Sequence, residues 1–387
     1  MTDAKAPRVC LLIGQLGLGG TEKQLALLAA GLRARGLRVS VLAMFDGGPY
    51  EQVLRAAGVP VLRLGFRRRS AGWWRMPYGN AVAFGRLVRL LWRGRPDVLH
   101  AYLFHAYTTA APAARLAGVP VVVAARRSLG RFKRGRPLAR AAEAAAALLT
   151  DHVVANSAAV ARDARREPGI RRGMISVIPN GLTADAFGRV PAARIDTRLP
   201  VVLCVANLIA YKGHRHLLDA MAVLRGRGAP CTLLLAGDGP ERAALRAQAA
   251  RLGVDVRLLG ARRDVPALLA RADVVVLASV EEGMSNAVME AMAAGRPIVA
   301  TAVGGTPELL GGPEDGPRGI LVPPGDPRAL ADGIGRVLGD PGAAARMAAR
   351  ARRWCRAHLT AEAMVERHVE LYARLLADPR RRRRCAG

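Results

Sequence analysis

The sequence predicts an α/β protein with two doubly wound, parallel-sheet domains that face each other, followed by C-terminal helices. The chain has 387 residues, which leaves room for two or three domains at roughly 150 residues per domain. Of these residues 51% are apolar and only 4% are aromatic, a composition typical of a globular chain. Short β-branched runs alternate with longer Ala-, Leu- and Arg-rich segments of helical period, which is the pattern of βα units.

The expected strands are the short apolar runs, and helical segments lie between most of them. In the first half they span 9–13, 39–44, 61–64, 98–101, 121–125, 153–155 and 175–178; in the second half they span 201–206, 231–236, 254–259, 274–278, 298–300 and 320–322. Between the two sets stand a turn signal, IPNG, and a polar stretch that contains proline. Such composition is typical of a connection between domains.

The turn signal and the polar stretch predict the domain boundaries. We expect a first domain over 1–188, a linker over 189–200 and a second domain over 201–360. The end of the chain shows helical spacing and no further strand, so a helix over 361–378 is a candidate to cross back to the first domain. Residues 379–387 form a basic tail.

The formal net charge is +29, from 59 Lys and Arg against 30 Asp and Glu. Such a charge favours phosphorylated substrates, acidic membrane surfaces or polyanions. Runs of arginine at 67–69 and 380–384 suit a phosphate or an anionic lipid surface. Solvated helix faces and a frayed terminus are the ordinary alternatives.

The chain has five cysteines, which are scattered along the sequence, and no two of them have C-x-x-C spacing. We therefore expect reduced, mostly buried thiols. The first residues, MTDAKAPR, lack the apolar region of a secretory signal, and no apolar run approaches 18 residues. We therefore expect a cytoplasmic protein without a spanning helix.

Polar or glycine-rich clusters follow five of the expected strands, where parallel sheets bind ligands. The loop GQLGLGGTE brings Gly19 and Gly20 to the start of a helix, although such a loop alone is a weak signal. HAYLFHA places His105 at the next helix start, either as a ligand contact or as a structural hydrogen-bonding group. ARRSLG places Arg126 and Arg127 where they could hold an anion.

Lys212 lies in the loop NLIAYKGHRH, beside Gly213 and before a helix. A point charge next to a helix N-terminus suits phosphate; an ordinary surface lysine is the alternative.

The fifth cluster, EEGMSNAVME, holds Glu282 and Glu290 with seven residues between them. Ser285 is a plausible N-cap for the helix that carries Glu290, while Glu282 precedes that helix. The two carboxylates then lie at different depths and do not oppose each other as an acid and a base. The backbone N–H groups of 283–286, which include those of Gly283 and Met284, lie between them and suit a phosphate. Hydroxyls at both ends with phosphates between them describe a nucleotide sugar.

In these residues the chain resembles the family 4 glycosyltransferases, retaining enzymes with the GT-B architecture of two Rossmann-like domains. The resemblance covers most of the chain. It rests on GLGGTEKQ at 17–24, YKGHRHLLDA at 211–220, LLLAGDGPER at 233–242, EGMSNAVMEAMAAGRPIVAT at 282–301, GGTPEL at 304–309 and GILVPPGDP at 319–327.

The resemblance implies a sugar transfer from a nucleotide sugar, which we expect to be UDP-linked, to a hydroxyl acceptor in glycan, lipopolysaccharide or exopolysaccharide synthesis. Glu282 and Lys212 would be the catalytic residues: Glu282 would bind donor-sugar hydroxyls, and Lys212 would hold the leaving diphosphate. Glu290 would hold the ribose. Ser285 and Asn286 would offer backbone N–H groups to the diphosphate.

Two further contacts are implied. Leu259 and the residue after it would lie at the base edge, and Gly19 and Gly20 would approach the donor or the acceptor. No metal or cofactor is expected, because Lys212 and the helix N-terminus can offset the leaving-group charge, and no D-x-D follows a strand.

Two departures from the family matter. Asn207 stands where many members have an arginine, so the diphosphate has one fixed charge fewer; we still expect Asn207 near the donor. Arg126 and Arg127 stand where many members have a histidine that contacts the donor sugar. An acceptor or diphosphate role for one of these arginines, together with His105, becomes possible.

Two other function classes stay open. A nucleotide-sugar 2-epimerase shares this architecture, but it needs carboxylates placed for proton removal, and none stand out in the first half. A basic nucleic-acid-binding protein would use the charge, but the arginines are scattered and no recognition motif occurs. The sequence leaves open the donor base, the sugar, the acceptor and its linkage, although the charge favours an acceptor at the anionic inner membrane surface.

Overall fold

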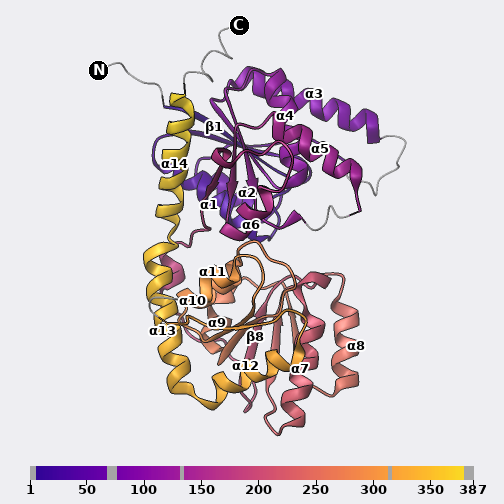
Figure 1. Ribbon diagram of the computed structural model, residues 1–387, viewed down its shortest axis with the longest axis vertical. Helices are drawn as coiled ribbons and strands as arrows, with labels where there is room; N and C mark the ends of the chain where they lie inside the picture. The colour runs from indigo at the N-terminus through magenta and orange to yellow at the C-terminus, as the bar shows by residue number, and fades with distance from the viewer. Residues whose placement is uncertain (1–5, 68–75, 131–134, 313–315, 379–387) are drawn as a thin grey trace. The chain divides into compact units, whose positions relative to one another are not determined.

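The computed structural model describes residues 6–67, 76–130, 135–312 and 316–378, and it confirms the predicted α/β fold class (Figure 1). The chain forms two compact units. Unit 1 comprises Met1–Gly181 and Ala361–Gly387, and unit 2 comprises Leu182–Thr360. The tail 379–387 and residues 68 and 69 of the first arginine run lie outside the described residues.

Unit 1 contains a seven-stranded parallel sheet in the order β3-β2-β1-β4-β5-β6-β7. Its strands are β1 Arg8–Ile13, β2 Arg38–Ala43, β3 Val61–Arg63, β4 Val98–Tyr102, β5 Val121–Arg126, β6 His152–Ala155 and β7 Ile175–Val177. Its helices are α1 Gly20–Ala34, α2 Pro49–Ala56, α3 Met76–Gly94, α4 Phe104–Leu116, α5 Pro137–Leu148, α6 Ala158–Ala164 and α14 Ala361–Ala377, with a 3-10 turn at Arg172–Met174.

Unit 2 contains a six-stranded parallel sheet in the order β10-β9-β8-β11-β12-β13. Its strands are β8 Val201–Val205, β9 Thr232–Ala236, β10 Val256–Gly260, β11 Val274–Leu277, β12 Ile298–Thr301 and β13 Ile320–Val322. Its helices are α7 His214–Gly226, α8 Arg242–Leu252, α9 Val265–Arg271, α10 Asn286–Ala293, α11 Thr306–Leu310, α12 Pro327–Gly339 and α13 Pro341–His358, with 3-10 turns at Ala184–Phe187 and Ala210–Lys212.

Each sheet is buried on both faces, which explains why its strands are continuous apolar runs. In β1, Leu11 and Ile13 belong to the core under α1 and α14, whereas Cys10 and Leu12 belong to the core under α3, α4 and α5. The four cysteines in the described part of the chain are free and buried. No helix there is both long and apolar enough to cross a membrane.

The first domain ends earlier than the sequence predicted. Leu182 and Phe187 already belong to a buried core of unit 2, and the Leu182 N–H donates to the Leu359 carbonyl at 2.8 Å. The expected linker 189–200 also lies in unit 2, where the Ala193 N–H donates to the Ala267 carbonyl at 2.9 Å. Polar composition therefore gave the wrong boundary, because backbone hydrogen bonds attach this stretch to the second unit.

Helix α14 follows unit 2 in the sequence but belongs to unit 1. Its residues Val365 and Tyr372 are buried in the core beside α1. Helices α1 and α14 approach closely at Gly31, where a Cβ would lie 2.5 Å from a methyl carbon of Val365. The Tyr372 hydroxyl lies 2.7 Å from Nδ1 of His100 on β4. A polar contact therefore joins the last helix to the middle of the first sheet.

His368 of α14 is fully buried, and its Nδ1 lies 2.8 Å from the Met364 carbonyl. Burial lowers the pKa of His368 to about 3, the Met364 hydrogen bond opposes this shift, and the charge of Arg127 adds to it. The unfolded chain binds a proton near pH 6.5. Because the folded pKa is depressed for a basic group, the neutral histidine stabilises the fold above pH 6.5, and this stability is lost as the pH falls.

We expect unit 1 to lose about 2 kcal/mol of unfolding free energy through His368 between pH 7.5 and pH 5. Chemical denaturation at both pH values measures this loss. A His368→Phe variant should show a smaller loss, and a variant of the exposed His358, His358→Gln, should behave as the parent. An unchanged pH dependence in His368→Phe would contradict the assignment.

Candidate functional site

Both sheets have the strand order of a doubly wound fold, in which the chain reverses direction across the sheet between two adjacent strands. In unit 2 these strands are β8 and β11, and in unit 1 they are β1 and β4. Loops that leave such a pair diverge to opposite faces and open a crevice at the carboxyl edge of the sheet, where ligands bind. The loop after β8 carries Lys212, and the loop after β11 carries Glu282.

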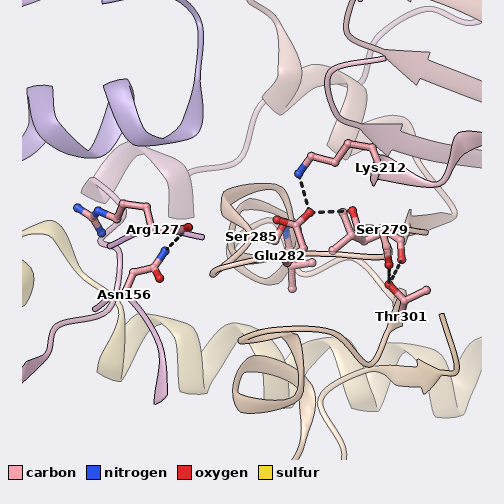
Figure 2. A network of polar contacts seen from close by, with 9 residues as sticks. Arg127, Asn156, Lys212, Ser279, Glu282, Ser285 and Thr301 are labelled. Atoms are coloured by element: carbon pink, nitrogen blue, oxygen red, sulfur yellow. Dashed lines mark hydrogen bonds and ion pairs between the residues drawn. The ribbon is translucent and has the colours of Figure 1, made fainter. Parts of the chain in front are cut away.

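Lys212 and Glu282 form an ion pair in unit 2 (Figure 2). The Lys212 Nζ donates to Oε1 of Glu282 at 2.6 Å, and the Ser279 hydroxyl donates to the same oxygen at 2.7 Å. Both contacts use Oε1, and Oε2 makes no hydrogen bond with any residue that the structure describes. Burial acts to lower the pKa of Lys212, but the charge and hydrogen bond of Glu282 outweigh it and raise that pKa. The lysine therefore stays protonated at neutral pH.

The two loops are also joined through their backbones. The Val280 N–H donates to the Tyr211 carbonyl at 2.8 Å. Gly213 has φ +69°, and a Cβ at this position would lie 1.9 Å from the Ala278 carbonyl oxygen. Only glycine accepts both this φ and this approach. The glycine after Lys212 thus lets the first loop lie against the end of β11, which explains the Lys-Gly pair in the sequence.

A third loop, after β12, supports Glu282 from another side. Gly304 has φ +54°, and its Cβ would lie 1.9 Å from the Glu282 carbonyl oxygen. The Gly305 N–H donates to the Gly283 carbonyl at 2.7 Å. The two glycines of GGTPEL therefore hold the backbone on which Glu282 stands.

Helix α10 begins as predicted. Ser285 is its N-cap, and the serine side chain accepts a hydrogen bond from the Val288 N–H at 3.4 Å. Gly283, Met284 and Ser285 are buried. The structure thus places three of the expected donor residues in the turn that leads into α10.

The remaining expected donor residues of unit 2 lie on three elements. Asn286 is the first residue of α10, and Glu290, half-buried, is further along the same helix between the buried Met289 and Ala291. Asn207 is exposed in the loop after β8, and Leu259 is half-buried near the end of β10. All of them follow or end parallel strands of one sheet, as the sequence predicted for a donor site.

Sequence reasoning missed the groups that hold Glu282 in place. Ser279 donates to its carboxylate, and the Thr301 hydroxyl donates to the Ser279 carbonyl at 2.5 Å (Figure 2). His214, the first residue of α7, is 3% exposed, and neither ring nitrogen has a partner among the described residues. Burial and the charge of Lys212 lower the pKa of His214 to about 4. The signal available was position, since Thr301 ends β12, Ser279 lies just after β11 and His214 opens α7.

The glycine loop of unit 1 has a local explanation. Gly19 is the N-cap of α1, and a Cβ there would lie 2.1 Å from Oε2 of Glu22. Glu22 is buried, and burial raises its pKa. Gly19 therefore makes room for a side chain of its own helix, while Gly20 opens that helix and is exposed. His105, the second residue of α4, is exposed.

Arg126 is not available as an acceptor contact in this structure. It is 7% exposed and forms a 2.6 Å ion pair with Glu143 of α5. The Tyr107 hydroxyl donates to the same carboxylate oxygen, and Arg126 lies 5.7 Å from the centre of the Tyr107 ring. The geometry thus argues against the substrate role that we considered for Arg126, because its charge is neutralised inside unit 1.

Arg127 has a different environment. It is 8% exposed, its Nη1 donates to Oδ1 of Asn180 at 2.6 Å, and its carbonyl accepts from Nδ2 of Asn156 at 3.4 Å (Figure 2). Its guanidinium carbon lies 5.2 Å from the centre of the Tyr102 ring. Of the two arginines, Arg127 is therefore the one whose charge has no acidic partner among the described residues.

Comparisons with known proteins agree with these features. A model of the family described as "Glycosyltransferase Family 4" matches residues 18–186, and a model of "Glycosyl transferases group 1" matches residues 199–340. The 2-deoxystreptamine glucosyltransferase of Streptomyces kanamyceticus is 29% identical over 352 residues, which cover 83% of this chain and 90% of that enzyme. The glycogen synthase of Mycobacterium tuberculosis strain CDC 1551 is 33% identical over 302 residues, which cover 72% and 70%.

A solved structure shows the same fold. Alr3699/HepE of Anabaena, in complex with UDP and glucose, superposes with a TM-score of 0.80 over 94% of this chain and 99% of that chain, at 23% identity.

The close approach at Gly213 yields a prediction. Gly213→Ala should destabilise unit 2 by about 2 kcal/mol or more, because alanine is strained at this positive φ and its Cβ would overlap the Ala278 carbonyl. The matched control is Gly226→Ala at the end of the same helix, where a Cβ meets no atom within 4 Å; it should leave stability unchanged or raise it. Thermal and denaturant unfolding measure both. Equal stability of the two variants would refute the constraint.

Proposed function

The chain belongs to the family 4, group 1 glycosyltransferases with the GT-B fold, and we propose that it transfers a sugar from a UDP-sugar to a hydroxyl acceptor with retention of configuration. The observation that carries this proposal is the Lys212–Glu282 ion pair beside the start of α10. Family membership favours this class over a 2-epimerase and over a nucleic-acid-binding protein.

In the proposed donor site, the diphosphate lies between Lys212 and the first backbone N–H groups of α10. An ammonium group has three donors, and Glu282 uses one of them, so Lys212 can also donate to phosphate oxygens. The α10 dipole favours negative charge at the same end. Glu290 holds the ribose hydroxyls, and the end of β10 near Leu259 receives the base. UDP rather than another nucleotide is supported by the nucleotide bound in the Anabaena structure.

In the proposed reaction, the bond between the sugar C1 and the phosphate oxygen breaks while the acceptor oxygen bonds to C1 from the same face. The leaving phosphate takes the acceptor proton, so neither glutamate acts as a nucleophile. Glu282 holds donor-sugar hydroxyls through Oε2, because Oε1 is already bonded to Lys212 and Ser279. Lys212 and α10 offset the charge that develops on the leaving group. We propose on this basis that the transfer needs no metal.

Glu290 offers the direct test of the donor site. Glu290→Ala should weaken UDP binding tenfold to a hundredfold, since hydrogen bonds to a charged group contribute about 1.5–3 kcal/mol. Isothermal titration of UDP measures the effect, and the exposed Glu362 of α14 supplies the control, Glu362→Ala. Unchanged UDP affinity in Glu290→Ala would exclude the assigned site.

The proposed retention of configuration has its own test. In a transfer assay with UDP-glucose, NMR of the product should show the α-anomer, and a β-anomer would contradict retention.

We further propose that the enzyme works at the cytoplasmic face of an anionic inner membrane, on a lipid-linked or lipopolysaccharide precursor. Helix α3 supports this proposal. Tyr78, Val82 and Trp92 are exposed by 79%, 55% and 59%, and Arg86 and Arg89 are exposed at intervals that place them on the same face. No Asp or Glu occurs between residues 76 and 94. Aromatic and basic side chains on one helix face suit the boundary of an acidic bilayer.

Reversing two of these charges tests the membrane contact. The double variant Arg86→Glu, Arg89→Glu should bind phosphatidylglycerol vesicles on the order of thirtyfold more weakly, at about 1 kcal/mol per arginine lost near the surface. Sedimentation with vesicles measures binding, and phosphatidylcholine vesicles give the neutral comparison. The control makes the same charge change on two other exposed arginines, Arg162 of α6 and Arg165 directly after it, as Arg162→Glu with Arg165→Glu. Equal losses in both double variants would indicate a general charge effect and reject α3 as the contact.

A further inference from the structure

Arg126 ends β5 and Arg127 follows it directly. Both arginines are more than nine-tenths buried, yet only one has an acidic partner. Arg126 pairs with Glu143 at 2.6 Å. Within the described part of the chain, Arg127 has no carboxylate within ion-pair distance, and its one side-chain hydrogen bond goes to the neutral amide of Asn180. A buried charge without a counter-charge is costly to the fold. Arg127 therefore needs an explanation that Arg126 does not.

The unpaired part of Arg127 is one edge of its guanidinium group. Nη1 donates to Asn180, whereas Nε is buried and has no hydrogen-bond partner among the described residues. Burial lowers the pKa of Arg127, and the nearby Tyr102 hydroxyl opposes that shift. The Nε and Nη2 groups point two N–H donors in nearly parallel directions, the geometry that matches the two oxygens of a carboxylate or phosphate. This edge of the guanidinium is thus the one suited to a bidentate anion.

The neighbours of Arg127 supply no negative charge. The titratable groups that act on it or feel its charge are Tyr102, Tyr372, His100 and His368. Burial and the nearby cations lower the pKa of His100 and His368, so both are neutral at pH 7. The cluster therefore carries one net positive charge.

Other polar atoms around Arg127 also lack partners. Oδ1 of Asn156 and Nε2 of His100 and of His368 are buried and have no hydrogen-bond partner among the described residues. Arg127 follows β5 directly and Asn156 follows β6 directly, so both lie at the carboxyl edge of the sheet, where parallel sheets bind ligands.

We propose that the Nε and Nη2 edge of Arg127 binds a carboxylate or phosphate group of a substrate, so that the enzyme acts on an anionic sugar or an anionic acceptor. This inference rests on the proposed function for the statement that the ligand is a sugar substrate. The charged group could belong to the donor sugar or to the acceptor, and the two sources call for separate probes.

The experiment compares probes that differ only in a carboxylate. UDP-glucuronate against UDP-glucose tests the donor, and glucuronate against glucose, each with and without UDP, tests the acceptor. Binding is measured by titration calorimetry and by thermal shift. We expect the parent to prefer the anionic member of one pair at least tenfold. Arg127→Gln and Arg127→Lys should lower that preference about tenfold while UDP binds as before.

Arg127→Lys keeps the positive charge but loses the paired Nε and Nη2 donors. This variant therefore still tests the proposal if Arg127→Gln does not fold. The control is Arg162→Gln, which removes an exposed arginine of unit 1. Equal binding of charged and neutral probes by the parent, or an anionic preference that survives in Arg127→Lys, overturns the proposal. Failure of UDP to bind the parent, together with a glucuronate preference that Arg127→Lys lowers, would count against the proposed transferase function alone.

Discussion

The site in unit 2 depends on the parallel pairing of β8 with β11. These strands are neighbours in the sheet, although Lys212 and Glu282, which follow them, are 70 positions apart in sequence. The strand pairing fixes where both loops start. The hydrogen bond from the Val280 N–H to the Tyr211 carbonyl fixes the distance between the two loops. The fold therefore places the Lys212 ammonium and the Glu282 carboxylate close together, and neither side chain has to explore other positions to form the ion pair. Ser279 and Thr301 extend this rigidity to the next strand, β12, through the Ser279 carbonyl.

The sequence predicted the fold well because each strand is a short apolar run and parallel strands are buried on both faces. It also predicted the N-cap at Ser285, since capping depends on a few local residues. The domain boundary was wrong, because a polar stretch with proline can be a linker or a segment attached to a core. Backbone bonds such as that of Ala193 are invisible in composition.

Arg126 and Arg127 show the same limit within the site. They are adjacent and chemically identical, so sequence position gave them one shared interpretation. Their difference comes from Glu143, which lies on helix α5 and neutralises only Arg126. Gly19 is similar, because its small size serves Glu22 and not only a ligand. Side-chain contacts in the folded chain decide such cases, and a motif does not encode them.

The return of α14 to unit 1 has a consequence for how the chain folds as it is made. The core of unit 1 includes Met364, Val365 and Tyr372, and His100 of β4 is bonded to Tyr372. A ribosome completes the first sheet long before it reaches these residues. During that interval His100 and the part of the sheet face that α14 covers lack their native cover, while unit 2 can fold as soon as residue 360 has emerged. Unit 1 therefore begins first and finishes last, and its exposed sheet face is a natural surface for a chaperone to protect.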